Sequence, residues 1–471
     1  MSRSRELAKN TVILTVGKLC TQFVSFLLLP LYTALLNPEE YGIVDLITTY
    51  TALLLPLVCW QYDMGVFRFM LDCRDDHQRI ETLFSSVAMV NAVQVAAFLL
   101  IAGIFGGFVQ LQYAGYLIAG VILNVFSGLL MQFARGLGEM LHYAVAGFVT
   151  AAGTIVLNVL FVAFLKMGAA GMLLATVCGI LLNCVYLFGA LKAWRYFNIR
   201  AYDRTVVWNV TKYSCPMVPN QLSGWVLSTS NRSIISWVLG VGATGVFAIA
   251  NKFSLLVATF YGFFNTAWIE TVSVHFEDED RDGFISSMLE TATSVFVSAC
   301  VGVIAVMPIV FPVMVDADYA EAYYQIPILV VSVIFQVLMG LYSAVYIAMK
   351  KSGEIAKTTI IGAVINVVLH LLLIRFAGLY AASVATAVSF AVVAIERRLD
   401  IRKYVNIQSN PRFAACAAAA VSWTTVSYYI NIPWLNGATL VLAILYAMFA
   451  NRSVLRALVE EIKKIVKKKR V

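Results

Sequence analysis

Long runs of apolar residues recur along the whole chain and limit what it can fold into. Each run is about 20 residues long, which is the length of helix that crosses the hydrocarbon core of a bilayer. Hydrophobic residues make up 61% of the chain and charged residues 13%, whereas soluble proteins are about 25% charged. Inside hydrocarbon, only a helix or a closed barrel satisfies its own backbone hydrogen bonds. The sequence therefore predicts an all-α integral membrane protein.

The apolar runs number fourteen in our interpretation of the sequence. The predicted spans are 11–36, 42–66, 80–107, 112–134, 142–165, 169–191, 213–239, 243–271, 284–311, 325–349, 355–375, 378–396, 412–430 and 433–450. The first run follows a polar, basic start and is too long for the core of a signal peptide, so we interpret it as an uncleaved span.

Basic residues gather at one end of these spans. If the spans alternate in direction, 29 of the 34 Lys and Arg lie on the side of the N-terminus, and Lys166 and Arg375 lie on the other. Loops that face the cytoplasm carry such an excess of positive charge. We therefore expect a multi-pass protein of the cytoplasmic membrane with both termini in the cytoplasm.

The first twelve spans form two similar halves around a predicted central cavity. An offset of 203 residues places Gly42 on Gly245 and Ser25 on Ser228. Because both halves begin on the same side, they are parallel repeats of six helices related by an axis along the membrane normal. The expected parts are an N-lobe (1–200, helices 1–6), a C-lobe (201–405, helices 7–12), two extra helices (406–451) and a basic tail (452–471), with the lobe boundary in the basic loop 192–212.

The tail at 452–471 carries one apolar stripe at helical spacing, with lysines on its other faces. This pattern is typical of an amphipathic helix that lies in the membrane interface. Each basic residue near an anionic leaflet contributes about 1 kcal/mol to such binding. We expect the tail to bind anionic membrane lipids on the cytoplasmic side; binding to a partner protein is the alternative.

Enzyme motifs are absent from the sequence. It contains no P-loop, HExxH or GxSxG pattern, and its Cys and His residues do not have the spacing of metal ligands. The predicted outward-facing loops are too short to build a catalytic domain. We therefore expect a protein that is not an enzyme and has no cofactor, no metal and no nucleic-acid partner.

A few charged residues lie inside the predicted spans, where each costs about 2.5–3.5 kcal/mol on insertion scales. The cations are Lys18, Arg232 and Lys252; Asp45 lies in the second span, and Glu270 ends the polar stripe of Lys252. One interpretation is a water-filled cavity that attracts anions, and the other is structural pairing of the cations with acids. Asp45 and Glu270 are accordingly candidates for coupling or for charge pairs.

Polar residues share helix faces with two of these cations. Gln22 follows Lys18 by one turn, and Gln221 and Ser228 share the face of Arg232. Phosphate or pyrophosphate would satisfy Lys and Arg together through charge-assisted hydrogen bonds. The predicted substrate-binding set is therefore Lys18, Arg232, Lys252, Gln22, Ser228 and Gln221.

Prolines interrupt the first two spans at Pro30 and Pro56. A proline removes one helical hydrogen bond and bends the helix. We interpret the two positions as hinges that let the outer halves of these spans bend as a gate; passive kinking is the alternative.

With these features the chain resembles the polysaccharide transporter family of repeat-unit, O-antigen-type flippases. That family lies within the multidrug/oligosaccharidyl-lipid/polysaccharide exporter superfamily. The resemblance is carried by the segment 41–46 (YGIVDL), the two repeats, the two extra C-terminal spans, and paired features in the two halves. These pairs are Gly138-Glu139 with Gly353-Glu354, and Asn158 with Asn366.

The resemblance implies a V-shaped pair of bundles with a cationic cavity. It also implies outward flipping of an undecaprenyl-pyrophosphate-linked oligosaccharide by alternating access, for surface polysaccharide biosynthesis. In lipid II flippases, cations on helices one and eight face the cavity. Lys18 and Lys252 lie on those helices here, with Lys where that group often has Arg. We expect a monomer, with polysaccharide polymerase or assembly proteins as further partners.

Two other functions remain open at this point. An ion-coupled exporter of drugs or other small molecules would need a mainly acidic cavity, whereas the charges inside these spans are mainly basic. A membrane glycan polymerase or ligase would need outward-facing catalytic loops, and the predicted loops are short.

Overall fold

The computed structural model describes residues 26–74, 76–106, 113–408, 410–456 and 460. The described residues form helices and no strand, and the predicted all-α membrane class is confirmed. Contacts divide the chain into two compact units, Met1–Ser233 (unit 1) and Ile234–Val471 (unit 2). The predicted lobe boundary in 192–212 stays a prediction.

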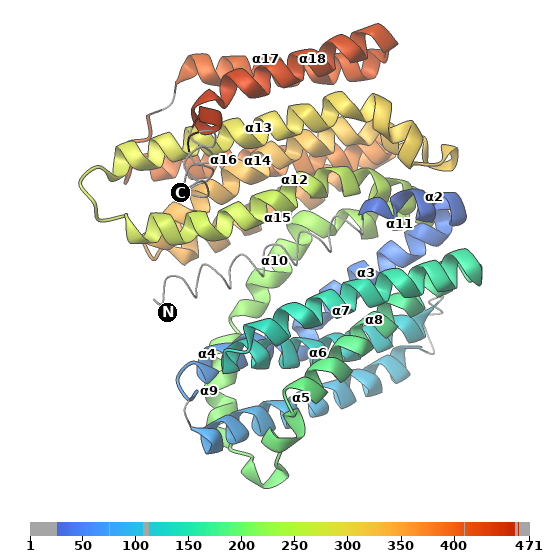
Figure 1. Cartoon of the computed structure of the whole chain (residues 1–471), viewed down its shortest axis with the longest axis vertical. Helices are drawn as coiled ribbons and strands as arrows, with labels where there is room; N and C mark the ends of the chain where they lie inside the picture. The colour runs from blue at the N-terminus through green and yellow to red at the C-terminus, as the bar shows by residue number, and fades with distance from the viewer. Residues whose placement is uncertain (1–25, 75, 107–112, 409, 457–459, 461–471) are drawn as a thin grey trace, which may run out of the picture. The chain divides into compact units, whose positions relative to one another are not determined.

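Unit 1 contains both long and short helices (Figure 1). Its helices are α2 (Leu29–Leu35), α3 (Pro38–Cys59), α4 (Tyr62–Met70), α5 (His77–Gly106), α6 (Ala114–Leu137), α7 (Met140–Asn158) with a π-helical end (Val159–Phe164), α8 (Gly168–Ala190), α9 (Arg204–Ser214), α10 (Met217–Thr229) and the start of α11 (Asn231–Leu239).

Unit 2 holds the longest helices and, in Figure 1, α17 and α18 run alongside α13. Its helices are α12 (Val241–Val274), α13 (Arg281–Met314), α14 (Ala322–Ala348), α15 (Ser352–Ala377), α16 (Leu379–Ile401), α17 (Pro411–Ile430) and α18 (Pro433–Ala450). Alanines at the contact let α17 and α18 approach α13 closely, where Ala443 packs on Val297, Val301 and Ala305.

Twelve helices of the described residues are long and apolar enough to cross a membrane. Each overlaps one of the predicted spans. The two predicted spans without such a helix are 11–36, which lies largely outside the described residues, and 213–239, which is divided between α10 and α11. The count of fourteen therefore stays a prediction.

The predicted span 213–239 is wrong as one continuous helix. Ser230 separates α10 from α11, and its Oγ donates to the backbone oxygen of Val226 at 2.6 Å. Short polar side chains compete in this way with the helical backbone pattern. The preceding basic segment 192–212 is also partly helical. Its α9 begins at Arg204, directly after the N-cap residue Asp203.

The predicted span 42–66 is divided as well. Trp60 and Gln61 adopt positive φ angles of 49° and 56° between α3 and α4. L-residues rarely adopt this conformation, and each such residue costs roughly 1–2 kcal/mol. Packing around α4 compensates for this cost, since Tyr62 is 2% exposed and Val66 and Met70 are fully buried.

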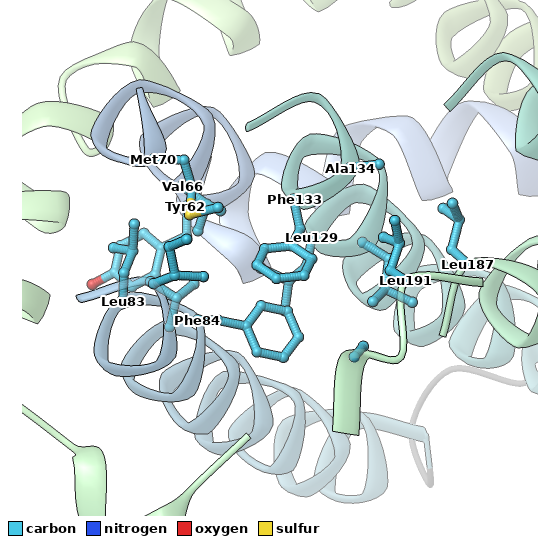
Figure 2. Packing of buried hydrophobic residues seen from close by; sticks show 14 of the residues in the cluster. Tyr62, Val66, Met70, Leu83, Phe84, Leu129, Phe133, Ala134, Leu187 and Leu191 are labelled. Carbon is cyan, nitrogen blue, oxygen red and sulfur yellow. The ribbon is translucent and has the colours of Figure 1, made fainter. Parts of the chain in front are cut away.

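The core of unit 1 joins α4, α5 and α6 (Figure 2). Phe84 of α5 faces Phe133 of α6 with ring centroids 4.3 Å apart. Gly136 allows close contact of α6 with α4, because a Cβ there would lie 2.6 Å from Cβ of Met70. Large apolar side chains and one glycine thus determine how closely these helices pack.

A completely buried arginine joins three helices of unit 2. Arg397, in the penultimate turn of α16, is 1% exposed, and all five of its N–H donors are used. The acceptors are neutral oxygens of Met339 and Ser343 on α14 and of Ile355, Thr358 and Thr359 on α15. Arg397 therefore holds α14, α15 and α16 together without a carboxylate partner among these acceptors.

Gly179 tests the packing of α8 on α7. A Cβ at this position would overlap the hydroxyl of Thr154 and lie 3.1 Å from the backbone oxygen of Thr150, whereas a Cβ at Gly189 would meet nothing within 4 Å. We expect Gly179→Ala to lower the free energy of unfolding by about 1–3 kcal/mol. The matched change Gly189→Ala should leave it unchanged or raise it slightly. Thermal unfolding in detergent checks both, and equal midpoints for the two variants would contradict the packing.

Candidate functional site

One face of α3 carries the polar groups of the candidate site. The helix starts at a capping box, in which Glu40 N–H donates to Asn37 Oδ1 at 2.9 Å and Asn37 N–H donates to Glu40 Oε2 at 3.2 Å. This strong start makes α3 begin at Pro38, before the predicted position 42. Tyr41, Asp45 and Thr49 then follow at four-residue spacing, which places them on one face.

Asp45 forms an ion pair with Arg232 of α11 inside unit 1. Arg232 Nε lies 2.6 Å from Asp45 Oδ2, and the two side chains are 13% and 18% exposed. Charged groups that are so little exposed need a partner, because burial of an isolated charge is costly. The pair therefore anchors the start of α11 to α3.

One hydrogen bond continues this interface along α3. Trp225 of α10 donates its indole Nε1–H to the backbone oxygen of Thr49 at 3.2 Å. Thr49 is 5% exposed, and Tyr41, one turn before Asp45, is 3% exposed. The ion pair thus lies on a helix face whose neighbours on both sides are buried.

The pair places a carboxylate beside a guanidinium at 2.6 Å. A guanidinium binds carboxylate and phosphate with the same fork of donors. An entering phosphate or pyrophosphate can therefore compete with Asp45 for Arg232. Release of Asp45 would in turn leave a carboxylate that needs a proton or another cation. The arrangement can couple the binding of an anion to the binding of a cation.

Gln221 and Ser228, which were predicted on the face of Arg232, do not join this pair. Both are exposed on α10. Ser228 Oγ donates to the backbone oxygen of Gly224 at 2.7 Å, within its own helix. Their role in substrate binding stays a prediction.

Lys252 and Glu270 lie on the same helix of unit 2, α12, but far apart. Lys252 is half-buried and Glu270 is exposed. Eighteen residues of helix separate them, which corresponds to roughly 27 Å along the axis. They therefore cannot act on one small ligand group together, and each stays a separate candidate.

The two predicted hinges lie at different places in their helices. Pro30 stands in the first turn of α2, where its missing N–H breaks no helical bond. Pro56 lies inside α3, and Trp60, with its left-handed backbone, ends the helix by donating its N–H to the oxygen of Pro56 at 3.1 Å. The prediction that these prolines form a gate stays open.

Several predicted features lie outside the described residues. These are Lys18 and Gln22, and all of the tail beyond 456 except residue 460. Among the residues that are described, no group of three or more His, Cys, Asp and Glu side chains could hold a metal ion.

Sequence reasoning missed Trp225 and Tyr41 as parts of the site. The signal was present in the helical spacing, because Trp225 follows Gln221 by one turn on α10 and Tyr41 precedes Asp45 by one turn on α3. Aromatic residues on such faces are common in membrane helices and did not stand out from the apolar background.

Solved structures with the same arrangement of helices define the class of fold. An inward-facing multidrug resistance MATE family transporter of the MOP superfamily matches with a TM-score of 0.70 and 15% identity, over 85% of this chain and 98% of that chain. The lipid II flippase MurJ, in an inward closed conformation, matches with a TM-score of 0.70 and 12% identity, over 95% and 100%. The chain has the all-helical fold of these membrane transporters.

The family is shown by the sequence comparison. The family described as polysaccharide biosynthesis protein matches residues 7–276, and the chain belongs to it. A relative from Haloferax volcanii, the probable low-salt glycan biosynthesis flippase Agl15, is 23% identical over 227 residues, which are 48% of this chain and 46% of that protein. The chain thus spans about half the length of the curated relative that it matches. The resemblance expected from the sequence is confirmed.

The ion pair can be tested by breaking it and by reversing it. We expect Arg232→Met to lower the free energy of unfolding by about 3 kcal/mol, since the carboxylate of Asp45, with only 18% of its side chain exposed, then loses its guanidinium. The charge-swapped double variant Asp45→Arg with Arg232→Asp should recover at least half of the loss. Thermal unfolding in detergent measures both, and a double variant no more stable than the single one would show that the pair contributes little.

Proposed function

We propose that this protein is a flippase for a lipid-linked oligosaccharide. The lipid carrier is undecaprenyl pyrophosphate, and movement runs from the inner to the outer leaflet of the cytoplasmic membrane by alternating access. The product would serve surface polysaccharide biosynthesis. Membership of the polysaccharide biosynthesis family supports this proposal, together with the similarity to the probable low-salt glycan biosynthesis flippase of Haloferax volcanii.

The single structural observation that carries the proposal is the guanidinium of Arg232, held beside Asp45 at 2.6 Å in a chain of apolar spans. A pyrophosphate needs a cationic side chain to bind it inside the membrane. That cation in turn needs an anionic partner when no substrate is bound. Asp45 supplies that partner while the substrate is absent. Lys18 and Lys252 are further candidates for the same charged group of the substrate.

Substrate binding and cation uptake are linked in this proposal. When pyrophosphate binds the guanidinium of Arg232, the carboxylate of Asp45 becomes available to a proton or a metal cation. The binding of each ligand then favours the binding of the other. Outward movement of the anionic headgroup is also favourable in an inside-negative potential, which supplies about 2.3 kcal/mol per charge for each 100 mV.

A second candidate function rests on the same pair. If a cationic small molecule enters, Asp45 becomes its ligand and Arg232 is the group displaced. This is the arrangement that an ion-coupled exporter of drugs or other small molecules would need. The two candidates therefore differ in which member of the pair contacts the substrate.

Reconstituted vesicles separate the two functions. We expect the native chain to move a lipid-pyrophosphate-linked oligosaccharide to the opposite leaflet, measured as glycan that becomes accessible to an added lectin. Arg232→Ala should slow this movement about 30-fold, equivalent to about 2 kcal/mol of lost charge-assisted binding. Lys252→Ala and Lys18→Ala should each slow it as well.

The charge-swapped variant is the decisive control, because it keeps an ion pair but moves the cation to α3. It should stay folded and still fail to move the lipid. Movement at the native rate would show that Arg232 acts through structure alone. If the native chain moves no such lipid but exports small cations, the second candidate replaces the first.

Orientation is tested at the two ends of α13. In a chain whose own cysteines are replaced by alanine, Glu279→Cys lies just before this helix and Ala320→Cys lies just after it, and both positions are exposed. The placement of the basic residues predicts that Glu279→Cys reacts with a membrane-impermeant maleimide in cells after permeabilisation only, whereas Ala320→Cys reacts before it. The reverse labelling pattern would invert the topology and the proposed direction of movement.

A further inference from the structure

A groove runs between α13, α14 and α17 of unit 2. Its volume is about 390 Å³, which lies within the range of ligand pockets, about 300–1,000 Å³. Most of its wall is apolar, with Leu289 and Val297 on α13 and Phe335 and Leu338 on α14. All of these residues belong to the same unit, so the groove depends on that unit alone.

The sequence of α17 explains why a groove forms here. This helix presents Ala414, Ala417 and Ala418 toward bulky side chains of α14, and Ala414 and Ala418 remain exposed. Small residues leave the space between the two helices unfilled. Because the three helices cross the membrane, they are surrounded by lipid acyl chains, which can enter this space.

The length of the groove matches one leaflet. Its lining on α13 extends from Ser286 to Val297, which corresponds to roughly 16 Å of helix. Half of the hydrocarbon core of a bilayer is about 15 Å. The groove begins at the end of the bundle where basic residues gather and stops near the middle of the spans. It therefore has the depth of a single acyl chain of the leaflet on that side.

Opposite charges stand at the basic end of the groove. Arg398 near the end of α16 and Glu290 in the third turn of α13 both line it, and both are half-buried. Within the described part of the chain, Glu290 forms no ion pair. A second cavity of about 430 Å³, lined by hydroxyl groups of Ser287 and Thr291, shares Glu290 with the groove. The charged end thus has room for a polar headgroup.

We propose that the groove is a binding site for one membrane glycerophospholipid whose headgroup carries a phosphate and a primary ammonium group, such as phosphatidylethanolamine. Arg398 binds the phosphate, Glu290 accepts hydrogen bonds from the ammonium, and one acyl chain lies along the alanines of α17. The site is separate from the Asp45–Arg232 pair and does not depend on the proposed transport function.

The headgroup chemistry distinguishes this lipid from other occupants. A polyprenyl pyrophosphate brings negative charge alone, which Glu290 would repel. Phosphatidylglycerol offers no cation to Glu290, and the quaternary ammonium of phosphatidylcholine cannot donate a hydrogen bond to it. A phosphate and a primary ammonium together match both charges of the groove.

Native mass spectrometry of the full chain tests the site. The chain is released from vesicles that contain equal amounts of phosphatidylethanolamine, phosphatidylglycerol and phosphatidylcholine, and the retained lipids are identified. We expect one phosphatidylethanolamine per chain. Ala418→Leu fills the groove and should lower this retention about tenfold, equivalent to about 1.4 kcal/mol. Ala419→Leu is the matched control, because Ala419 is exposed on the same helix but does not line the groove.

Two charge variants test the headgroup assignment. Glu290→Gln should keep one lipid but abolish the preference for phosphatidylethanolamine, whereas Arg398→Gln should lower retention of all three phospholipids. Equal retention by Ala418→Leu and Ala419→Leu would overturn the groove as the site. Equal retention of the three headgroups by the native chain, or displacement of the phospholipid by an added polyprenyl phosphate, would overturn the assigned lipid.

Discussion

Hydrocarbon offers no hydrogen bonds, and this constraint governs how each polar group of the chain is placed. Many hydroxyl groups on the spans bond back to the helix that carries them, as Thr51 does to the oxygen of Ile47 at 2.8 Å. Asn183 instead reaches across to α7, where its amide donates to Ala146 O at 3.2 Å and to Thr150 Oγ1 at 2.7 Å. Both solutions replace the water that a soluble protein would use. Thr51 thus bonds within its own helix, whereas Asn183 joins two helices.

Two arginines illustrate different consequences of the same constraint. Arg397 is satisfied by five neutral acceptors on two neighbouring helices, so its charge is distributed over a fixed network. Arg232 is held by the carboxylate of Asp45. A guanidinium bound to five groups has little freedom to leave them, whereas an ion pair can be exchanged for a second anion. This difference is why Arg232, and not the more deeply buried Arg397, is the candidate for contact with a substrate.

A break between two helices adjoins the Asp45–Arg232 ion pair. The interruption at Ser230 comes two residues before Arg232, so the cation stands at the start of a short helix and not within a rigid long one. Trp60 and Gln61, whose backbone is left-handed, end α3 about four turns after Asp45. Arg232 therefore lies directly beside a helix break, whereas Asp45 lies within the continuous helix α3. A small rotation of α11 at Ser230 can separate the pair without unfolding either helix.

The sequence by itself determined the class of protein, most of its spans and its family. Length and apolar composition suffice for a span, because burial in lipid depends on the whole segment and not on its neighbours. The tertiary structure decided where two of those spans break and which charges meet. Asp45 and Arg232 are 187 positions apart in the chain, and no local pattern reports a contact over that distance. The groove on α17 likewise exists because alanines there face bulky residues of α14. Only the tertiary fold brings these two helices together.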